Sequence, residues 1–102
     1  MENWIKVCKL EDIPVLGSRL VKGKSCEIAL FRDGTDRVYA LHDRCPHKGG
    51  PLSQGIVSNG RVTCPLHGMN IGLEDGRAIS PDEGCTETFS VRIDEGAVYI
   101  SL

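Results

Sequence analysis

The sequence predicts an all-β protein, a small antiparallel sandwich or open barrel. Short apolar segments are separated by turn residues, apolar and polar residues alternate strictly near the C-terminal end, and no segment carries a sustained 3.6-residue apolar stripe. A chain of 102 residues is the size of one domain, so residues 1–102 are expected to share one fold. Residues 43–81 are rich in Gly, Pro, Cys and His and are expected to form an insert between the outer strands.

The N-terminal half is expected to contain three strands and one helical turn. Residues 4–10 form a short apolar segment, and residues 11–14 resemble a helical turn that ends at a proline. Residues 26–32 and 37–42 are expected to pair as a hairpin. The loop between them, residues 33–36, contains a glycine where we expect the backbone to turn.

The C-terminal part is expected to form a second hairpin. Apolar and polar residues alternate over residues 88–93, which predicts one half-buried strand. Residues 94–97 then form a turn, and residues 98–102 repeat the alternation as the returning strand. Inside the insert, a strand is expected to start near Asn70, with a tight turn at residues 75–76.

Composition excludes several classes of function. The formal net charge of −2 and the pI near 5.9 give no basic surface for nucleic acid. No apolar stretch approaches membrane-spanning length, and the first residues lack the features of a signal peptide, so we expect a soluble cytoplasmic protein. No acid–base constellation is present, so we expect no catalytic site in this chain alone.

Two short motifs carry the chemistry. Cys45 and His47 form a Cys-x-His pair, and Cys64 and His67 form a Cys-x2-His pair. A Rieske [2Fe–2S] centre requires this ligand set, because two cysteines bind one iron and two histidines bind the other. The motifs therefore predict one such cluster per chain and an electron-transfer function, with these four residues as metal and cofactor ligands.

A structural zinc site is the alternative for the same four residues. Zinc motifs usually space their histidines more widely or repeat Cys-x2-Cys, so the Cys-x-His pair favours iron. The other cysteines, Cys8, Cys26 and Cys85, are most simply unpaired small apolar residues in a reducing compartment. Cys85 lies in a polar segment, and a functional role for its thiol is left open.

The paired motifs resemble those of the Rieske family, and most closely the small subunit of assimilatory NAD(P)H-dependent nitrite reductase. The resemblance lies in Cys45–Val57, in Val62–His67 and in residues 82–85, Asp-Glu-Gly-Cys, and it extends over almost the whole chain. It implies a Rieske-like fold with an inserted cluster-binding subdomain. It also implies a role as electron carrier beside a large flavin- and sirohaem-containing subunit that reduces nitrite to ammonia.

Differences from other Rieske proteins leave two alternatives open. Respiratory Rieske proteins carry a disulfide between the loops, at positions held here by Gly50 and Leu66. They also carry hydroxyl donors where this chain has Met69 and Ile71, which argues for the low end of the Rieske potential range of about −150 to +300 mV. The nitrite reductase branch often has an aromatic residue at position 69. One alternative is a free Rieske ferredoxin that donates electrons to a ring-hydroxylating oxygenase or similar mono-oxygenase. The other is a binding module with a structural metal.

Overall fold

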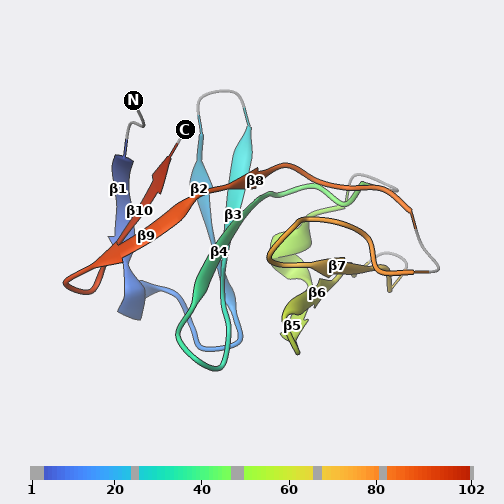
Figure 1. Ribbon diagram of the computed structural model, residues 1–102, viewed down its shortest axis with the longest axis horizontal. Helices are drawn as coiled ribbons and strands as arrows, with labels where there is room; N and C mark the ends of the chain where they lie inside the picture. The colour runs from blue at the N-terminus through green and yellow to red at the C-terminus, as the bar shows by residue number, and fades with distance from the viewer. Residues whose placement is uncertain (1–3, 24–25, 47–49, 66–67, 81–82, 102) are drawn as a thin grey trace.

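The computed structural model describes residues 4–23, 26–46, 50–65, 68–80 and 83–101 (Figure 1). Within these ranges the chain forms short β-strands in three antiparallel sheets, together with two single-turn 3₁₀ helices. The elements are β1 (Trp4–Lys9), η1 (Leu10–Asp12), β2 (Ser18–Lys22), β3 (Glu27–Arg32), β4 (Val38–His42), η2 (Leu52–Gln54), β5 (Ile56–Ser58), β6 (Arg61–Thr63), β7 (Asn70–Gly72), β8 (Thr88–Phe89), β9 (Val91–Asp94) and β10 (Ala97–Ser101). Within the described residues, no helix has the length and apolar character needed to cross a membrane.

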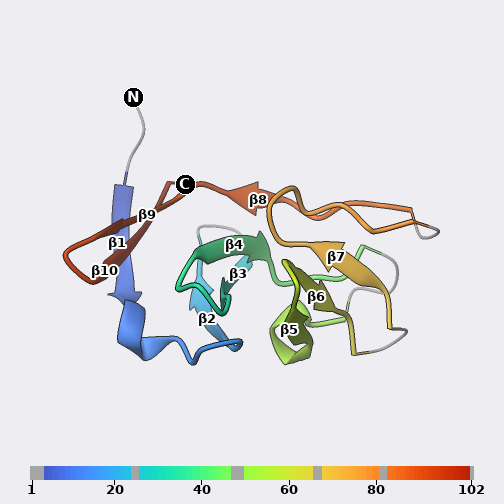
Figure 2. The ribbon, with the colours of Figure 1, turned by 60° about the horizontal axis from the view of Figure 1, so that its bottom comes forward.

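The three sheets follow one another along the long axis of the molecule. Sheet order is β1-β10-β9 at one end, β2-β3-β4-β8 in the middle and β5-β6-β7 at the other end. Figures 1 and 2 show the last sheet beside the central one and away from both termini. This third sheet lies within the range 43–81 that was expected to hold the insert.

The central sheet has a hydrophobic core on each face. The body core consists of Cys8, Ile13, Ile28, Leu30, Val38, Ala40, Val98 and Ile100. The insert core consists of Ala29, Phe31, Leu41, Cys45, Leu52, Val57, Val62, Cys64, Met69, Ile71 and Leu73. Successive residues of a strand point to opposite faces, and both faces of β3 are covered by a core. For this reason β3 is apolar over four consecutive positions, residues 28–31, without alternation.

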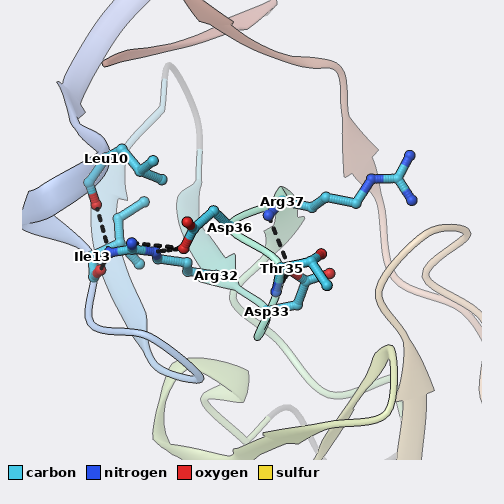
Figure 3. A network of polar contacts seen from close by, with 7 residues as sticks. All are labelled: Leu10, Ile13, Arg32, Asp33, Thr35, Asp36 and Arg37. Atoms are coloured by element: carbon cyan, nitrogen blue, oxygen red, sulfur yellow. Dashed lines mark hydrogen bonds and ion pairs between the residues drawn. The ribbon is translucent and has the colours of Figure 1, made fainter.

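The all-β fold class is confirmed, and so are β1, the helical turn η1 and the hairpin of β3 and β4. The backbone turns at Gly34 and Thr35, as expected for this loop. Asp36, with φ of 67°, takes the left-handed conformation in this hairpin, and Gly34 has no positive φ. Aspartate tolerates that conformation better than most residues. Arg32 holds Asp36 through an ion pair of 2.7 Å (Figure 3).

The same hairpin is bound to the N-terminal segment by hydrogen bonds (Figure 3). Arg32 Nη1 donates to the carbonyl oxygens of Leu10 and Ile13, at 3.3 and 2.8 Å. Asp33 accepts from the hydroxyl and N–H of Thr35 and from the N–H of Arg37. Burial raises the pKa of Asp33, but these hydrogen bonds outweigh it and leave the pKa below its usual value.

The single strand expected over residues 88–93 is wrong. Residues 88–89 pair with β4 as β8, whereas Val91–Asp94 pair with β10 as β9, so the chain changes sheets at Ser90. Alternation continues across the change because both short strands have one apolar face. The hairpin turn expected at residues 94–97 is confirmed, with positive φ at Glu95 and Gly96.

Candidate metal centre

The first motif lies just after β4, at the beginning of the insert. Cys45 is 1% exposed, and its N–H donates to the carbonyl oxygen of Gly50 at 2.7 Å, which closes a loop. Asp43 precedes this loop and accepts hydrogen bonds from Ser53, which follows it in η2. His47 lies outside the described residues. The first loop is therefore bridged twice, by the backbone hydrogen bond from Cys45 to Gly50 and by the contacts between Asp43 and Ser53.

The second motif follows β6 and leads into β7. Cys64 is 1% exposed, and its N–H donates to the carbonyl oxygen of Met69 at 2.7 Å. Gly68 has a φ of +69° and donates its N–H back to the carbonyl oxygen of Cys64 at 3.0 Å. His67 lies outside the described residues. The two loops thus share one backbone plan, in which the cysteine N–H bonds to a carbonyl five residues ahead.

Both cysteines belong to the insert core, where Leu52 and Met69 are also buried. Two buried thiols at the beginning of two hydrogen-bonded loops are what the cysteine side of a Rieske site requires. Thus the structure brings Cys45 and Cys64 into one cluster of side chains, and the donor set of the two motifs fits the cofactor. The assignment of all four ligands stays a prediction, since neither histidine lies within the described residues.

A third segment, residues 83–87, packs beside the first loop. A Cβ atom placed on Gly84 would lie 3.1 Å from the Cβ of Pro46, so this segment is in close contact with the first loop. Close by, Ile79 donates its N–H to the carbonyl oxygen of Asn70, which follows the second loop. The chain in Figure 2 returns past β7 before it enters β8. Residue patterns predicted only a polar loop here, because a contact between residues 46 and 84 leaves no local signal in the sequence.

The remaining cysteines have unpaired thiols, as expected. Cys85 is exposed and pairs with Arg77 through an isolated backbone bridge. Cys8 is buried in the body core, where burial raises the pKa of its thiol. The nearby charge of Arg19 opposes this rise and that of Asp12 adds to it. Cys8 is therefore a neutral packing residue, whereas Cys85 is exposed and Cys26 is partly exposed.

Residues 3–101 match the Rieske-like [2Fe–2S] domain family. The chain belongs to this family. The 3-phenylpropionate/cinnamic acid dioxygenase ferredoxin subunit of Escherichia coli (strain K12) is 34% identical over 98% of this chain and 94% of its own length. By contrast, the match to the chloroplastic protein TIC 55 of Pisum sativum, at 29% identity, spans only 20% of that protein.

Solved structures show the same fold. A chain of the complex of reduced oxygenase and oxidised ferredoxin in carbazole 1,9a-dioxygenase superposes with a TM-score of 0.85 and 32% identity, over 96% of this chain and 92% of that one. A putative NADPH nitrite reductase small subunit superposes with a TM-score of 0.87 and 27% identity, over 96% of this chain and 97% of that one.

Family membership and the ferredoxin relatives imply a Rieske [2Fe–2S] cluster and make this chain a Rieske-type electron carrier. When bound, such a cluster supplies a one-electron redox centre. Its potential lies between about −150 and +300 mV, above the ~−400 mV of plant-type clusters, which have only cysteine ligands. Cys45 and Cys64 are buried and so are shielded from bulk water.

Proposed function

We propose that Cys45 and Cys64 bind one iron of the cluster and that His47 and His67 bind the other. The observation that carries this assignment is the burial of both cysteines in the insert core, each at the first position of a hydrogen-bonded loop. Cys8 and Cys26 are poor candidates, because Cys8 lies in the separate body core and Cys26 packs against it. In this proposal residues 1–102 act as one Rieske domain, with residues 43–81 as its cluster-binding insert, and the chain works in the cytoplasm.

We further propose that the chain is the small subunit of an assimilatory NAD(P)H nitrite reductase. The three motif segments that resemble that branch support this proposal, as does the full-length similarity to a putative nitrite reductase small subunit. The partner would be a large subunit with flavin and sirohaem. In such an assembly this chain relays single electrons and the large subunit performs the chemistry on nitrite.

A free ferredoxin that serves a ring-hydroxylating oxygenase and its reductase is the second candidate. The observation that favours it is sequence identity. The dioxygenase ferredoxin subunit is 34% identical and the carbazole dioxygenase structure 32%, compared with 27% for the nitrite reductase small subunit. Both candidates use the same cluster and differ in the proteins that exchange electrons with it.

The two candidates are separated by deleting the gene and scoring growth. A nitrite reductase subunit is required for growth on nitrate or nitrite as sole nitrogen source, and complementation with the wild-type gene should restore that growth. Normal growth on nitrite, together with lost growth on an aromatic carbon source, would contradict the nitrite reductase proposal and support the oxygenase ferredoxin.

The ligand assignment has its own test. Protein purified without chelator should contain two irons and two labile sulfides per chain. After reduction with dithionite it should give a rhombic electron paramagnetic resonance signal, with an average g value below that of a cluster with four cysteine ligands. A colourless protein with one zinc per chain would refute the assignment.

A further inference from the structure

Ser53 connects three parts of the molecule. Its N–H donates to Oδ1 of Asp43 at 2.6 Å, and its hydroxyl donates to Oδ2 of the same carboxylate at 3.0 Å. Its carbonyl oxygen accepts from the hydroxyl of Ser18 on β2 at 2.6 Å. All three contacts are partly buried. One residue of η2 is therefore bound both to the segment before the first ligand loop and to the edge strand of the central sheet.

The Asp43–Ser53 pair spans the whole first loop. Asp43 stands two residues before Cys45. Ser53 follows the loop and is next in sequence to Leu52, a fully buried residue of the insert core. The second loop has a comparable bridge, since the hydroxyl of Thr63 donates to the side-chain oxygen of Asn70 at 2.7 Å. Each ligand loop is thus closed at its base by a pair of polar side chains.

We propose that the Asp43–Ser53 pair is a positioning element that holds the first ligand loop closed on the central sheet and slows loss of the cluster. The chain has Gly50 and Leu66 where respiratory Rieske proteins carry the disulfide that joins their loops. Without that covalent link, the loop is restrained by hydrogen bonds at its base together with the contact of Gly84 on Pro46. This inference rests on the proposed assignment of Cys45 as a ligand.

The physical basis is the coupling of metal binding to loop order. A loop that is already closed loses less conformational entropy when its cysteine binds iron, so the bound state is more stable. A carboxylate that accepts two hydrogen bonds holds its partners more firmly than a neutral acceptor does. Removal of groups that orient metal ligands commonly lowers metal affinity about 10- to 100-fold.

The chain offers a matched control. In the hairpin of β3 and β4, Asp33 accepts from both the N–H and the hydroxyl of Thr35, each at 2.8 Å. Asp43 likewise accepts from the N–H and the hydroxyl of one residue, but through two carboxylate oxygens, whereas Asp33 uses Oδ1 for both bonds and also accepts from the N–H of Arg37. The Asp33 contacts belong to a hairpin that carries no proposed ligand. Asp43→Ala and Asp33→Ala therefore remove the same kind of contact at two places.

The experiment measures bleaching of the visible absorbance of the holoprotein in excess chelator, together with thermal stability. We expect Asp43→Ala to lose its cluster about 10-fold faster than wild type. We expect Asp33→Ala to lose it at the wild-type rate, even where both variants melt at similar temperatures. Asp43→Asn keeps one side-chain oxygen as an acceptor, so we expect an intermediate rate.

Hydrogen–deuterium exchange of the holoprotein gives a second measurement that does not depend on activity. Peptides that cover residues 43–53 should exchange faster in Asp43→Ala and stay unchanged in Asp33→Ala. Equal bleaching rates and equal exchange in the two variants, while wild type retains its iron and sulfide, would overturn the positioning role alone. A wild-type protein without iron and sulfide would overturn the ligand assignment as well.

Discussion

Gly55 provides a sharp test of how the insert packs. Its backbone, with φ of −81° and ψ of 178°, is one that alanine adopts without strain. The restriction comes from space, because an added Cβ would lie 2.3 Å from the carbonyl oxygen of Thr63 and 2.9 Å from a methyl group of Val62. Real Cβ atoms do not approach other atoms so closely, so β5 and β6 must move apart in Gly55→Ala.

The expected cost follows from these contacts. Overpacking typically costs about 1–3 kcal/mol. The nearest atom here is a backbone oxygen that cannot rotate away, so we expect a loss near 3 kcal/mol in the free energy of unfolding. The reduced entropy of the unfolded chain returns only about 0.4–1 kcal/mol. At about 4–8 °C per kcal/mol for a domain of this size, the melting temperature should fall by roughly 10–20 °C.

Gly60→Ala is the matched control. Gly60 has a φ of +75° with nothing within 4 Å of an added Cβ, so only the left-handed backbone is penalised, at about 1–2 kcal/mol. Thermal unfolding followed by circular dichroism compares the two variants. Because Thr63 precedes Cys64, Gly55→Ala should also purify with less iron. A Gly55→Ala protein that is as stable as Gly60→Ala would refute the close approach of β5 and β6.

Three further outcomes are expected. The pKa of Asp33 is lowered in the folded protein. The stabilisation from the ionised carboxylate is therefore present above the unfolded-state pKa of about 3.9 and is lost as the pH falls through the lower folded-state pKa. Asp33→Asn should flatten that part of a curve of stability against pH. Iodoacetamide at pH 8 should label Cys85 and spare Cys8, whose thiol is buried and has a raised pKa, and mass spectrometry that finds Cys8 labelled first would contradict the packing. His67→Ala should purify with little or no cluster while Cys26→Ala keeps the native spectrum, and a full native cluster in His67→Ala would exclude His67 as a ligand.

Local patterns predicted most of the outer strands and the spacing of the expected ligands. The alternation of residues 98–101 and the Asp-Glu-Gly-Ala turn before them are properties of neighbouring residues, so they could be recognised without the fold. The change of sheets at Ser90 could not be predicted, because alternation describes which side chains are apolar and not which strand they pair with. β5 and β6 are three residues each, too short for a period to be visible.

The candidate metal site, like the fold, could be predicted from the sequence only in part. Cys45 and Cys64 were predicted from spacing alone, and the structure places both in one core. Asp43 and Ser53 lie ten positions apart in the sequence, and Pro46 and Gly84 lie 38 positions apart. Such pairs join segments that are far apart in the sequence, so no local pattern contains them.

The central strand β3 has a consequence for how the protein can change over evolution. Ile28 and Leu30 pack toward the terminal strands, whereas Ala29 and Phe31 pack toward the ligand loops. With Cys45 and Cys64 as the proposed ligands, substitutions at positions 29 and 31 are expected to alter the surroundings of the cluster. Substitutions at positions 28 and 30 are expected to affect the body core. A shift of one residue in its pairing would exchange the two sets and disrupt both at once. Four adjacent residues thus divide between two hydrophobic cores, so that each core can be altered at its own positions.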